Sequence, residues 1–285
     1  MIALGERVLL TGTSSGIGLA TAVECAAAGH AVVATMRDAS RASALEEAAR
    51  EAGVTIAIEE LDVTAPDTGD RVRELVAKHG GFGALVNNAG IGVLGPFEEQ
   101  SEDDVRSQIE TNVLGVLAVT RAILPSMREA GRGRIVNVSS LSGRISPPLI
   151  SVYAATKHAV EGFSESLRWE VEPFGVRVTT VAPGMVKTPM FFEGLRRASL
   201  RSDTGPYAAM REALEKKILA GAQKGLGPEA VGAVIARVLS DPSPPHHVPV
   251  GAEARVLSTL RRVMPERLMK GMMRRAFATK HHARG

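Results

Sequence analysis

The sequence is poor in cysteine, in tyrosine and in long apolar runs. Cys25 is the single cysteine, so the chain cannot form an internal disulfide, and no set of residues has the spacing of a metal site. No apolar run approaches the roughly 20 residues that a membrane-spanning helix needs. Charge appears within the first six residues, so we expect no signal peptide and a cytoplasmic location.

The net charge of +3 is unevenly distributed along the chain. Residues 251–285 hold nine Lys or Arg and two Glu, a balance of +7, so the rest of the chain sums to −4. The basic character therefore belongs to the C-terminal segment. We expect no nucleic-acid partner for the body of the protein.

Short apolar segments alternate with longer helical patterns. Most of the short segments are too uniformly apolar for a sheet with one wet face, and they suit a parallel sheet that is covered on both sides. The alternation predicts an α/β fold, a doubly wound parallel sheet of seven strands with helices on both faces. The predicted strands are 7–12, 31–36, 55–63, 84–90, 134–140, 176–184 and 246–251. The predicted helices are 17–29, 41–52, 66–80, 101–130, 151–173 and 228–240.

Two segments interrupt this rhythm without a clear linker, so we expect one domain over residues 1–285. The first, 185–227, follows the sixth strand, where ligands of open α/β sheets lie, and we interpret it as a helical substrate flap. The second, 252–285, is a basic amphipathic extension. It has a Leu or Met at every fourth position, and Pro265 suits the first turn of a second helix. These four residues are Leu260, Met264, Leu268 and Met272.

A glycine-rich loop, "TGTSSGIG", joins the first strand to the first helix. Gly12 can permit the turn out of the strand, Gly16 a close approach of the backbone to a pyrophosphate, and Gly18 tight packing of helix on strand. The helix N-terminus then offers free N–H groups and a partial positive charge to the phosphates. This arrangement predicts a Rossmann-like dinucleotide site.

The end of the second strand distinguishes the two dinucleotides. A carboxylate there would bond the ribose of NAD, but Met36 takes that position and Arg37 follows. Arg37 suits the 2′-phosphate of NADP, with Thr13 and Ser14 near enough to add hydroxyl donors. Asp38 can cap the next helix instead. We therefore expect NADP(H) as the preferred cofactor and keep NAD(H) as the alternative.

Tyr153 and Lys157 are four residues apart in "VYAATKHAV". In a helix they share one face, and an ammonium beside a phenol favours the ionised phenol, which lowers its pKa. Such a pair is a general acid–base, although a surface pair has the same spacing.

The surrounding motifs resemble the classical short-chain dehydrogenases/reductases. "TGTSSGIG", "LDVT", "LVNNAG", "TNVLG", "IVNVSS", "YAATK" and "VAPGMVKTPM" occur in the order and rough spacing of that family, over about residues 5–190. The "ATMRD" strand end and the long C-terminal part look most like the branch with NADP-preferring hydroxysteroid and retinol-type dehydrogenases. The glycine loop lacks the basic residue that some NADP-using members place there.

The resemblance implies a role for each matching residue. Tyr153 matches the catalytic acid–base, and Lys157 the lysine that lowers its pKa and bonds the nicotinamide ribose. Ser140, 13 positions before the tyrosine, matches the serine that binds the substrate oxygen. Asn112 matches the asparagine that holds a water in a proton relay. With the glycine loop, the resemblance gives these cofactor contacts: Gly12, Thr13, Ser14, Ser15, Gly16, Ile17, Gly18, Arg37, Asp62, Val63, Asn88, Ala89, Gly90, Tyr153, Lys157, Pro183, Gly184, Val186 and Thr188.

The implied function is an NADP(H)-dependent oxidoreductase that interconverts a secondary alcohol and a ketone. An NAD(H)-dependent dehydrogenase, a 3-oxoacyl reductase and a nucleotide-sensing protein are the alternatives. Five apolar residues stand close together at the start of the flap: Met185, Met190, Phe191, Phe192 and Leu195. They suit a bulky apolar substrate, or else they form the flap's own core.

We expect a homodimer or homotetramer. The C-terminal extension packs on a subunit, lies on an anionic membrane surface, or is simply solvated.

Overall fold

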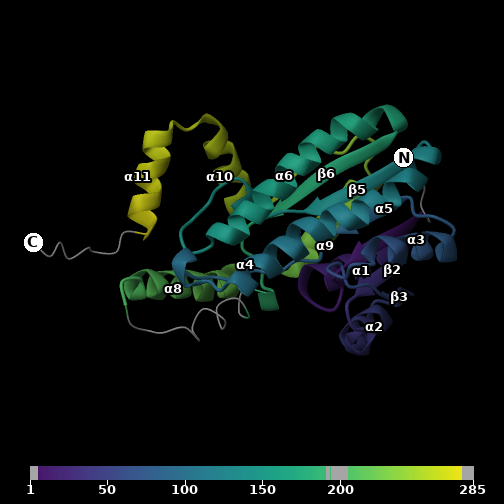
Figure 1. Cartoon of the computed structure of the whole chain (residues 1–285), viewed down its shortest axis with the longest axis horizontal. Coiled ribbons are helices and arrows are strands. Elements are labelled where there is room, and N and C mark those ends of the chain that lie inside the picture. The colour runs from purple at the N-terminus through teal and green to yellow at the C-terminus, as the bar shows by residue number, and fades with distance from the viewer. Residues whose placement is uncertain (1–5, 191–192, 194–204, 278–285) are drawn as a thin grey trace, which may run out of the picture.

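The computed structural model describes residues 6–190, 193 and 205–277, and it contains one parallel sheet of seven strands (Figure 1). The strand order is β3-β2-β1-β4-β5-β6-β7, so the chain reverses its direction of winding between β1 and β4. This confirms the predicted doubly wound sheet, and the reversal point is where such sheets bind ligands. The strands are β1 Arg7–Thr11, β2 Ala31–Met36, β3 Ala57–Glu60, β4 Ala84–Asn87, β5 Gly133–Val138, β6 Val176–Pro183 and β7 His247–Val250.

Helices cover both faces of the sheet because both faces of its strands are apolar. Val8 and Leu10 of β1 point to one face, whereas Leu9 points to the other, as the two-residue period of a strand requires. The first face is covered by α1 Gly16–Ala27, α2 Ser43–Glu51 and α9 Pro228–Ser240. The second is covered by α3 Thr68–His79, α5 Gly115–Glu129 and α6 Ser151–Val171.

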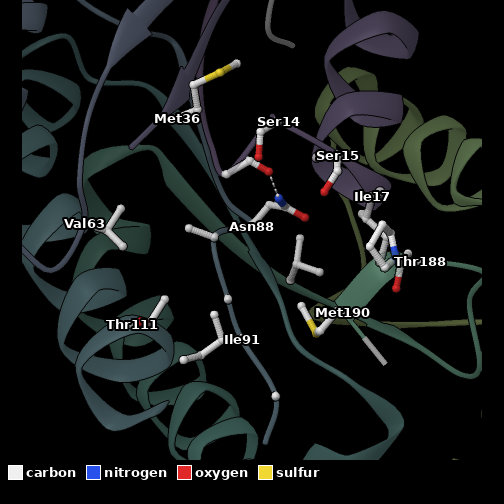
Figure 2. Close-up of a pocket in the computed structure, with 18 of the residues that line it drawn as sticks. Ser14, Ser15, Ile17, Met36, Val63, Asn88, Ile91, Thr111, Thr188 and Met190 are labelled. Carbon is white, nitrogen blue, oxygen red and sulfur yellow. Dashed lines mark hydrogen bonds between the residues drawn. The ribbon is translucent and has the colours of Figure 1, made fainter. Parts of the chain in front are cut away.

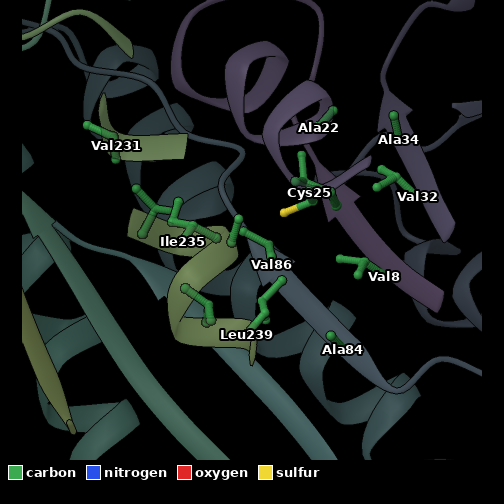
Figure 3. Packing of buried hydrophobic residues seen from close by; sticks show 14 of the residues in the cluster. Val8, Ala22, Cys25, Val32, Ala34, Ala84, Val86, Val231, Ile235 and Leu239 are labelled. Atoms are coloured by element: carbon green, nitrogen blue, oxygen red, sulfur yellow. The ribbon is translucent and has the colours of Figure 1, made fainter. Parts of the chain in front are cut away.

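The core on the first face joins the start of the chain to its last third. Figure 3 shows Cys25 of α1 beside Val8 and Val32, while Ile235 and Leu239 of α9 approach Val86 from the other side. Burial raises the pKa of the Cys25 thiol to about 12, so this cysteine is an inert packing residue. The packing of α1 against α9 fixes the position of α1, whose N-terminus lies in the glycine loop.

The predicted helix 101–130 is interrupted. It consists of α4 Glu102–Ile109, a π-helical turn η3 at Glu110–Leu114, and α5. Ser101 caps α4 through a capping box with Asp104. A π-turn widens the backbone and often marks a functional site, and this one carries Asn112. The remaining short helices are η1 Ala39–Arg41, η2 Phe97–Glu99, η4 Leu141–Gly143 and η5 Glu172–Phe174.

The segment 185–227 contains α8 Ala208–Lys224, which runs below the sheet in Figure 1. Phe191, Phe192 and Leu195 lie outside the described residues. The bridge between Val186 and Leu226 closes the base of the segment.

The C-terminal extension forms two helices, α10 Ala252–Val263 and α11 Glu266–Phe277, with the break at Pro265 as predicted. The predicted packing face is wrong in one respect. Leu268 is 62% exposed, whereas its neighbour Met269 is 9% exposed. No helix among the described residues is long and apolar enough to cross a membrane.

Candidate active site

A cavity of about 370 Å³ opens at the carboxyl ends of the strands, beside the point where the winding reverses. Figure 2 shows Ser14, Ser15 and Ile17 of the glycine loop on one side and Val63, Thr111 and Ile91 on the other, with Asn88 between them. The loops after β1, β2, β3, β4, β5 and β6 all contribute lining residues. One cavity therefore collects the motifs that are dispersed in the sequence.

Two glycines keep the floor of this cavity open. Gly12 has φ of +72°, and a Cβ there would lie 2.6 Å from the Cα of Ala89. A Cβ on Gly18 would overlap the carbonyl oxygen of Gly12. Any side chain at either position would displace backbone, so the loop and the start of α1 form a cradle that only glycine permits.

Asn88 holds the glycine loop in place. Its side-chain amide donates to the carbonyl oxygens of Thr11 and Gly12, both at 2.9 Å. The Thr11 hydroxyl accepts in turn from the backbone N–H groups of Asn88 and Ala89, both at 3.1 Å. These four hydrogen bonds tie the end of β4 to the end of β1, so the side chain of Asn88 supports the cradle and its backbone lines it.

The far end of the cavity is basic. Arg37 and Arg41 both line it, together with Ser14. Asp38 lines it as well, and its carboxylate caps η1 by accepting from the N–H (3.0 Å) and hydroxyl (2.6 Å) of Ser40. The two guanidinium groups suit a phosphate, since the nearby carboxylate of Asp38 is already engaged by Ser40. Arg41 was missed in the sequence, although its position four residues after Arg37 was a readable signal.

Thr13 does not line the cavity, which corrects its predicted role as a hydroxyl donor to phosphate. The residue is fully buried, and its hydroxyl donates to the carbonyl oxygen of Thr35 at 3.1 Å. The reason lies in the loop itself, because the turn at Gly12 directs the next side chain into the protein. Ser14 and Ser15 are the hydroxyl residues of this loop that line the cavity.

Tyr153 and Ser140 face each other at the inner end of the cavity. Both are buried, and their side chains are hydrogen-bonded. Burial raises the pKa of Tyr153, and the hydrogen bond from Ser140 opposes that rise. The expected fall in its pKa is therefore absent from the protein alone, because desolvation of the phenolate outweighs the nearby dipoles.

Lys157 lies one turn after Tyr153 on α6, with its Nζ 5.7 Å from the centre of the tyrosine ring. The ammonium donates to the carbonyl oxygen of Val138 at 2.9 Å. Burial lowers its pKa to about 8, and the negative charge of Glu161 opposes the change. A lysine that titrates near neutrality can take part in proton transfer.

Asn112 lies behind the cavity rather than in its wall. Its Oδ1 accepts from the N–H of Ile91 at 2.8 Å, and its Nδ2 donates to the Ile91 carbonyl at 2.8 Å and to Thr156 at 3.0 Å. A Cβ on Gly90 would lie 3.2 Å from this Oδ1 and 3.7 Å from Nζ of Lys157. Asn112 and Lys157 therefore both approach the same glycine, which leaves no room for a side chain there.

An apolar cluster surrounds the aromatic ring of Tyr153. It brings together residues from the loop after β4, the segment before α6, and α8 of the flap. Leu149 belongs to it with φ of +68°, a strained conformation for a bulky residue, and its carbonyl accepts from the N–H of Gly95 at 2.7 Å. The buried members are Leu94, Leu149, Ile150, Tyr153, Ala154, Leu214 and Ile218, with Met190 and Met210 packed against them.

Helix α8 is also attached by polar contacts. Arg211 forms an ion pair with Glu99 of η2, and the Tyr207 hydroxyl is hydrogen-bonded to Glu98. These contacts hold α8 against the loop after β4, over the apolar cluster.

The cavity thus brings together most of the predicted site residues. Thr13 and Asn112 are the two that do not line it. The predicted residues that line it are Gly12, Ser14, Ser15, Gly16, Ile17, Gly18, Arg37, Asp62, Val63, Asn88, Ala89, Gly90, Ser140, Tyr153, Lys157, Pro183, Gly184, Val186 and Thr188.

A family model described as short chain dehydrogenase matches residues 6–197. Among curated proteins, the chain is 33% identical to a 3-ketodihydrosphingosine reductase of Bacteroides thetaiotaomicron, over 96% of this chain and 98% of the relative. It is 35% identical to human retinol dehydrogenase 8, over 92% of this chain and 87% of the relative.

Solved structures show the same likeness. A short-chain dehydrogenase from Streptomyces avermitilis superposes with a TM-score of 0.78 at 34% identity, over 96% of this chain and 99% of that one. An actinorhodin polyketide ketoreductase with NADPH gives 0.73 at 29%, over 88% and 97%. A Burkholderia phymatum short-chain dehydrogenase in complex with NAD gives 0.77 at 26%, over 92% and 95%.

Proposed function

Because the chain belongs to the short-chain dehydrogenase/reductase family and is an NAD(P)-dependent oxidoreductase, we propose that it interconverts a secondary alcohol and a ketone with NADP(H). The observation that carries this proposal is the convergence of Ser140, Tyr153 and Lys157 at the inner end of a cavity whose outer end holds Arg37. The cradle at Gly12 and Gly18 fits a dinucleotide, since its phosphates need backbone without side chains. When bound, the nicotinamide supplies or accepts the hydride.

The preference for NADP(H) rests on charge. Arg37 and Arg41 flank the end of the cavity where the adenosine ribose would lie, and the nearby Asp38 carboxylate is engaged with Ser40. Guanidinium groups bind phosphate through several hydrogen bonds at once. The similar solved structures include one with NADPH and one with NAD, so they do not distinguish the two cofactors. The two arginines are the feature of this chain that favours NADPH.

The protein's own residues handle the proton and the developing charge. In ketone reduction, Ser140 donates a hydrogen bond to the substrate oxygen as negative charge builds on it, and Tyr153 delivers the proton. The ammonium of Lys157, 5.7 Å from the centre of the ring, stabilises the tyrosinate that results. Asn112 fixes the backbone at Ile91 beside Lys157. In alcohol oxidation the same steps run in reverse.

The substrate that we propose is bulky and apolar. Tyr153 and Met190 line the cavity, and the leucine and isoleucine side chains of the apolar cluster pack behind them. Two relatives are named for lipid-like substrates, a ketodihydrosphingosine and a retinol, which supports the same class here. Residues 185–227 then act as a flap within one domain that spans residues 1–285.

A turnover assay against a panel of ketones tests this function. Loss of NADPH should be fast with long-chain or polycyclic ketones and slow with short polar ones, because only the former are large and apolar enough to gain from the apolar side of the cavity at Tyr153 and Met190. If no ketone or alcohol in the panel is turned over with NADP(H) or NAD(H), the proposed function is wrong.

We also propose a homodimer or homotetramer, which the exposed apolar side chains of Ile109 and Leu114 support (41% and 53% exposed). Analytical ultracentrifugation tests it.

For the C-terminal extension we propose packing on the subunit, because Ala254 of α10 is fully buried and lies near Gly184. Contact with an anionic membrane through exposed Leu268 and its basic neighbours is the alternative, and the cytoplasmic location stays a prediction.

A further inference from the structure

A buried carboxylate lies one helical turn beyond Lys157. Glu161 is 8% exposed and follows Lys157 by four residues on α6, so the two side chains share one face of the helix. Glu161 neither lines the cavity nor belongs to the motifs from which the site was predicted. A buried charge of this kind is costly unless several groups compensate it.

Three elements outside α6 provide that compensation. Oε2 of Glu161 accepts from Arg144 Nη2 at 3.0 Å and from the Thr180 hydroxyl of β6 at 3.1 Å, and it lies 3.3 Å from His247 Nδ1 of β7. Burial alone would raise the pKa of Glu161, but the hydrogen bond from His247 and the charge of Arg144 outweigh it and hold the pKa below its usual value. Glu161 is therefore ionised at neutral pH.

The position of Arg144 connects this network to the substrate serine. Arg144 directly follows η4, the short helix that Ser140 caps by accepting from the N–H of Ser142 at 3.1 Å. A Cβ on Gly143 would lie 3.0 Å from Cγ of Glu161 and 3.0 Å from the carbonyl oxygen of Lys157. The loop that carries Ser140 thus packs directly on the turn of α6 between the lysine and the glutamate.

We propose that Glu161 is a positioning residue for the reaction. It anchors the Ser140 loop to α6 through Arg144, and its negative charge keeps Lys157 protonated beside Tyr153. This inference rests on the proposed function, since it assigns Glu161 a task in the proton transfer of that reaction. The charged and titratable groups that face Glu161 are Lys157 on its own helix, Arg144 after η4 and His247 on β7.

The direction of the expected pH effect follows from the pKa of Lys157. Its pKa of about 8 in the folded protein lies below the ordinary value of 10.5. Below about pH 8 the folded chain holds the buried ammonium and its attraction to Glu161, and as the pH rises through this value both are lost. Glu161→Gln should therefore lower the pKa of Lys157 further, so that the decline of ketone reduction with rising pH begins at a lower pH.

The matched control is Glu59→Gln. Glu59 is also nearly buried, at 9% exposed, and it is paired with Lys78 and His79 at the far edge of the sheet. We expect both variants to lose thermal stability. Glu161→Gln alone should move the high-pH limb of the kcat/KM profile to a lower pH, by about half a pH unit or more. Its kcat near neutrality should also be reduced about tenfold.

A second measurement needs no turnover, so it separates this proposal from the proposed function. The free energy of unfolding of the cofactor-free chain is compared for wild type and variant at about pH 7.5 and 9.5. The destabilisation by Glu161→Gln should shrink at the higher pH, where Lys157 is neutral, whereas that by Glu59→Gln should not. An unchanged pH limb together with a pH-independent destabilisation would show that Glu161 is only structural, and would overturn the proposal.

Discussion

The ammonium of Lys157 lies 5.7 Å from the centre of the Tyr153 ring, and its hydrogen bond goes to the backbone of Val138 rather than to the phenol. In the proposed reaction the lysine would therefore act on the tyrosine through its charge and not through a direct hydrogen bond. The carbonyl of Val138 fixes the ammonium at the end of β5, next to the strand end that leads to Ser140. The distance between acid and cation is thus set by the packing of α6 on the sheet.

The basic end of the cavity predicts a switch in cofactor preference. In Arg37→Asp, a carboxylate would repel the 2′-phosphate and could accept from a 2′-hydroxyl, so the ratio of kcat/KM for NADP over NAD should fall about tenfold or more. Arg41→Ala should lower the same ratio by a smaller factor. Arg50→Ala is the control, because Arg50 is an exposed arginine of α2 outside the cavity. A ratio that stays constant in the first two variants would exclude these arginines as the discriminating residues.

The apolar cluster predicts a selective effect on bulky substrates. Leu214→Ala removes a side chain of α8 that is 9% exposed and packs in the cluster around Tyr153. KM for long-chain or polycyclic ketones should rise several-fold, with little change for small ketones. Leu219→Ala on the same helix is the control, since Leu219 is 44% exposed. Equal effects of the two variants on every ketone would place the substrate elsewhere.

Two adjacent residues of α11 distinguish packing from membrane contact. Met269→Ala should lower the thermal stability of the chain, because it removes a buried side chain worth about 2 kcal/mol or more. Leu268→Ala should leave the stability nearly unchanged, because that side chain is exposed. Binding to anionic vesicles is measured for both. Vesicle binding that is lost in Leu268→Ala, with stability unchanged in Met269→Ala, would favour the membrane surface over packing.

The fold and most of the site could be predicted from the sequence because their signals are local. A strand, a turn at Gly12 and a helix follow one another between Arg7 and Ala27, and the spacing of Tyr153 and Lys157 is read directly from one helix. The side chain of Thr13 was placed wrongly because the direction of a loop residue depends on the turn before it.

Other features depend on segments that are distant in the sequence. The cluster around Tyr153 joins residues near 94, 150 and 214, and the network of Glu161 joins η4, β6 and β7. The raised pKa of Tyr153 has the same origin, since burial is a property of the assembled fold and not of the i,i+4 pair. The spacing of Tyr153 and Lys157 therefore predicts the proposed chemistry, whereas the pKa values of the two side chains depend on the surrounding fold.

The central claim is that Tyr153 transfers the proton in an NADP(H)-dependent reduction of a ketone. The most direct test is single-turnover oxidation of bound NADPH by a bulky ketone in wild type and in Tyr153→Phe, with cofactor affinity measured in parallel by nicotinamide fluorescence. The variant should bind NADPH within about threefold of wild type, while the rate of hydride transfer should fall about a thousandfold or more. A rate within tenfold of wild type, at unchanged affinity, would contradict it.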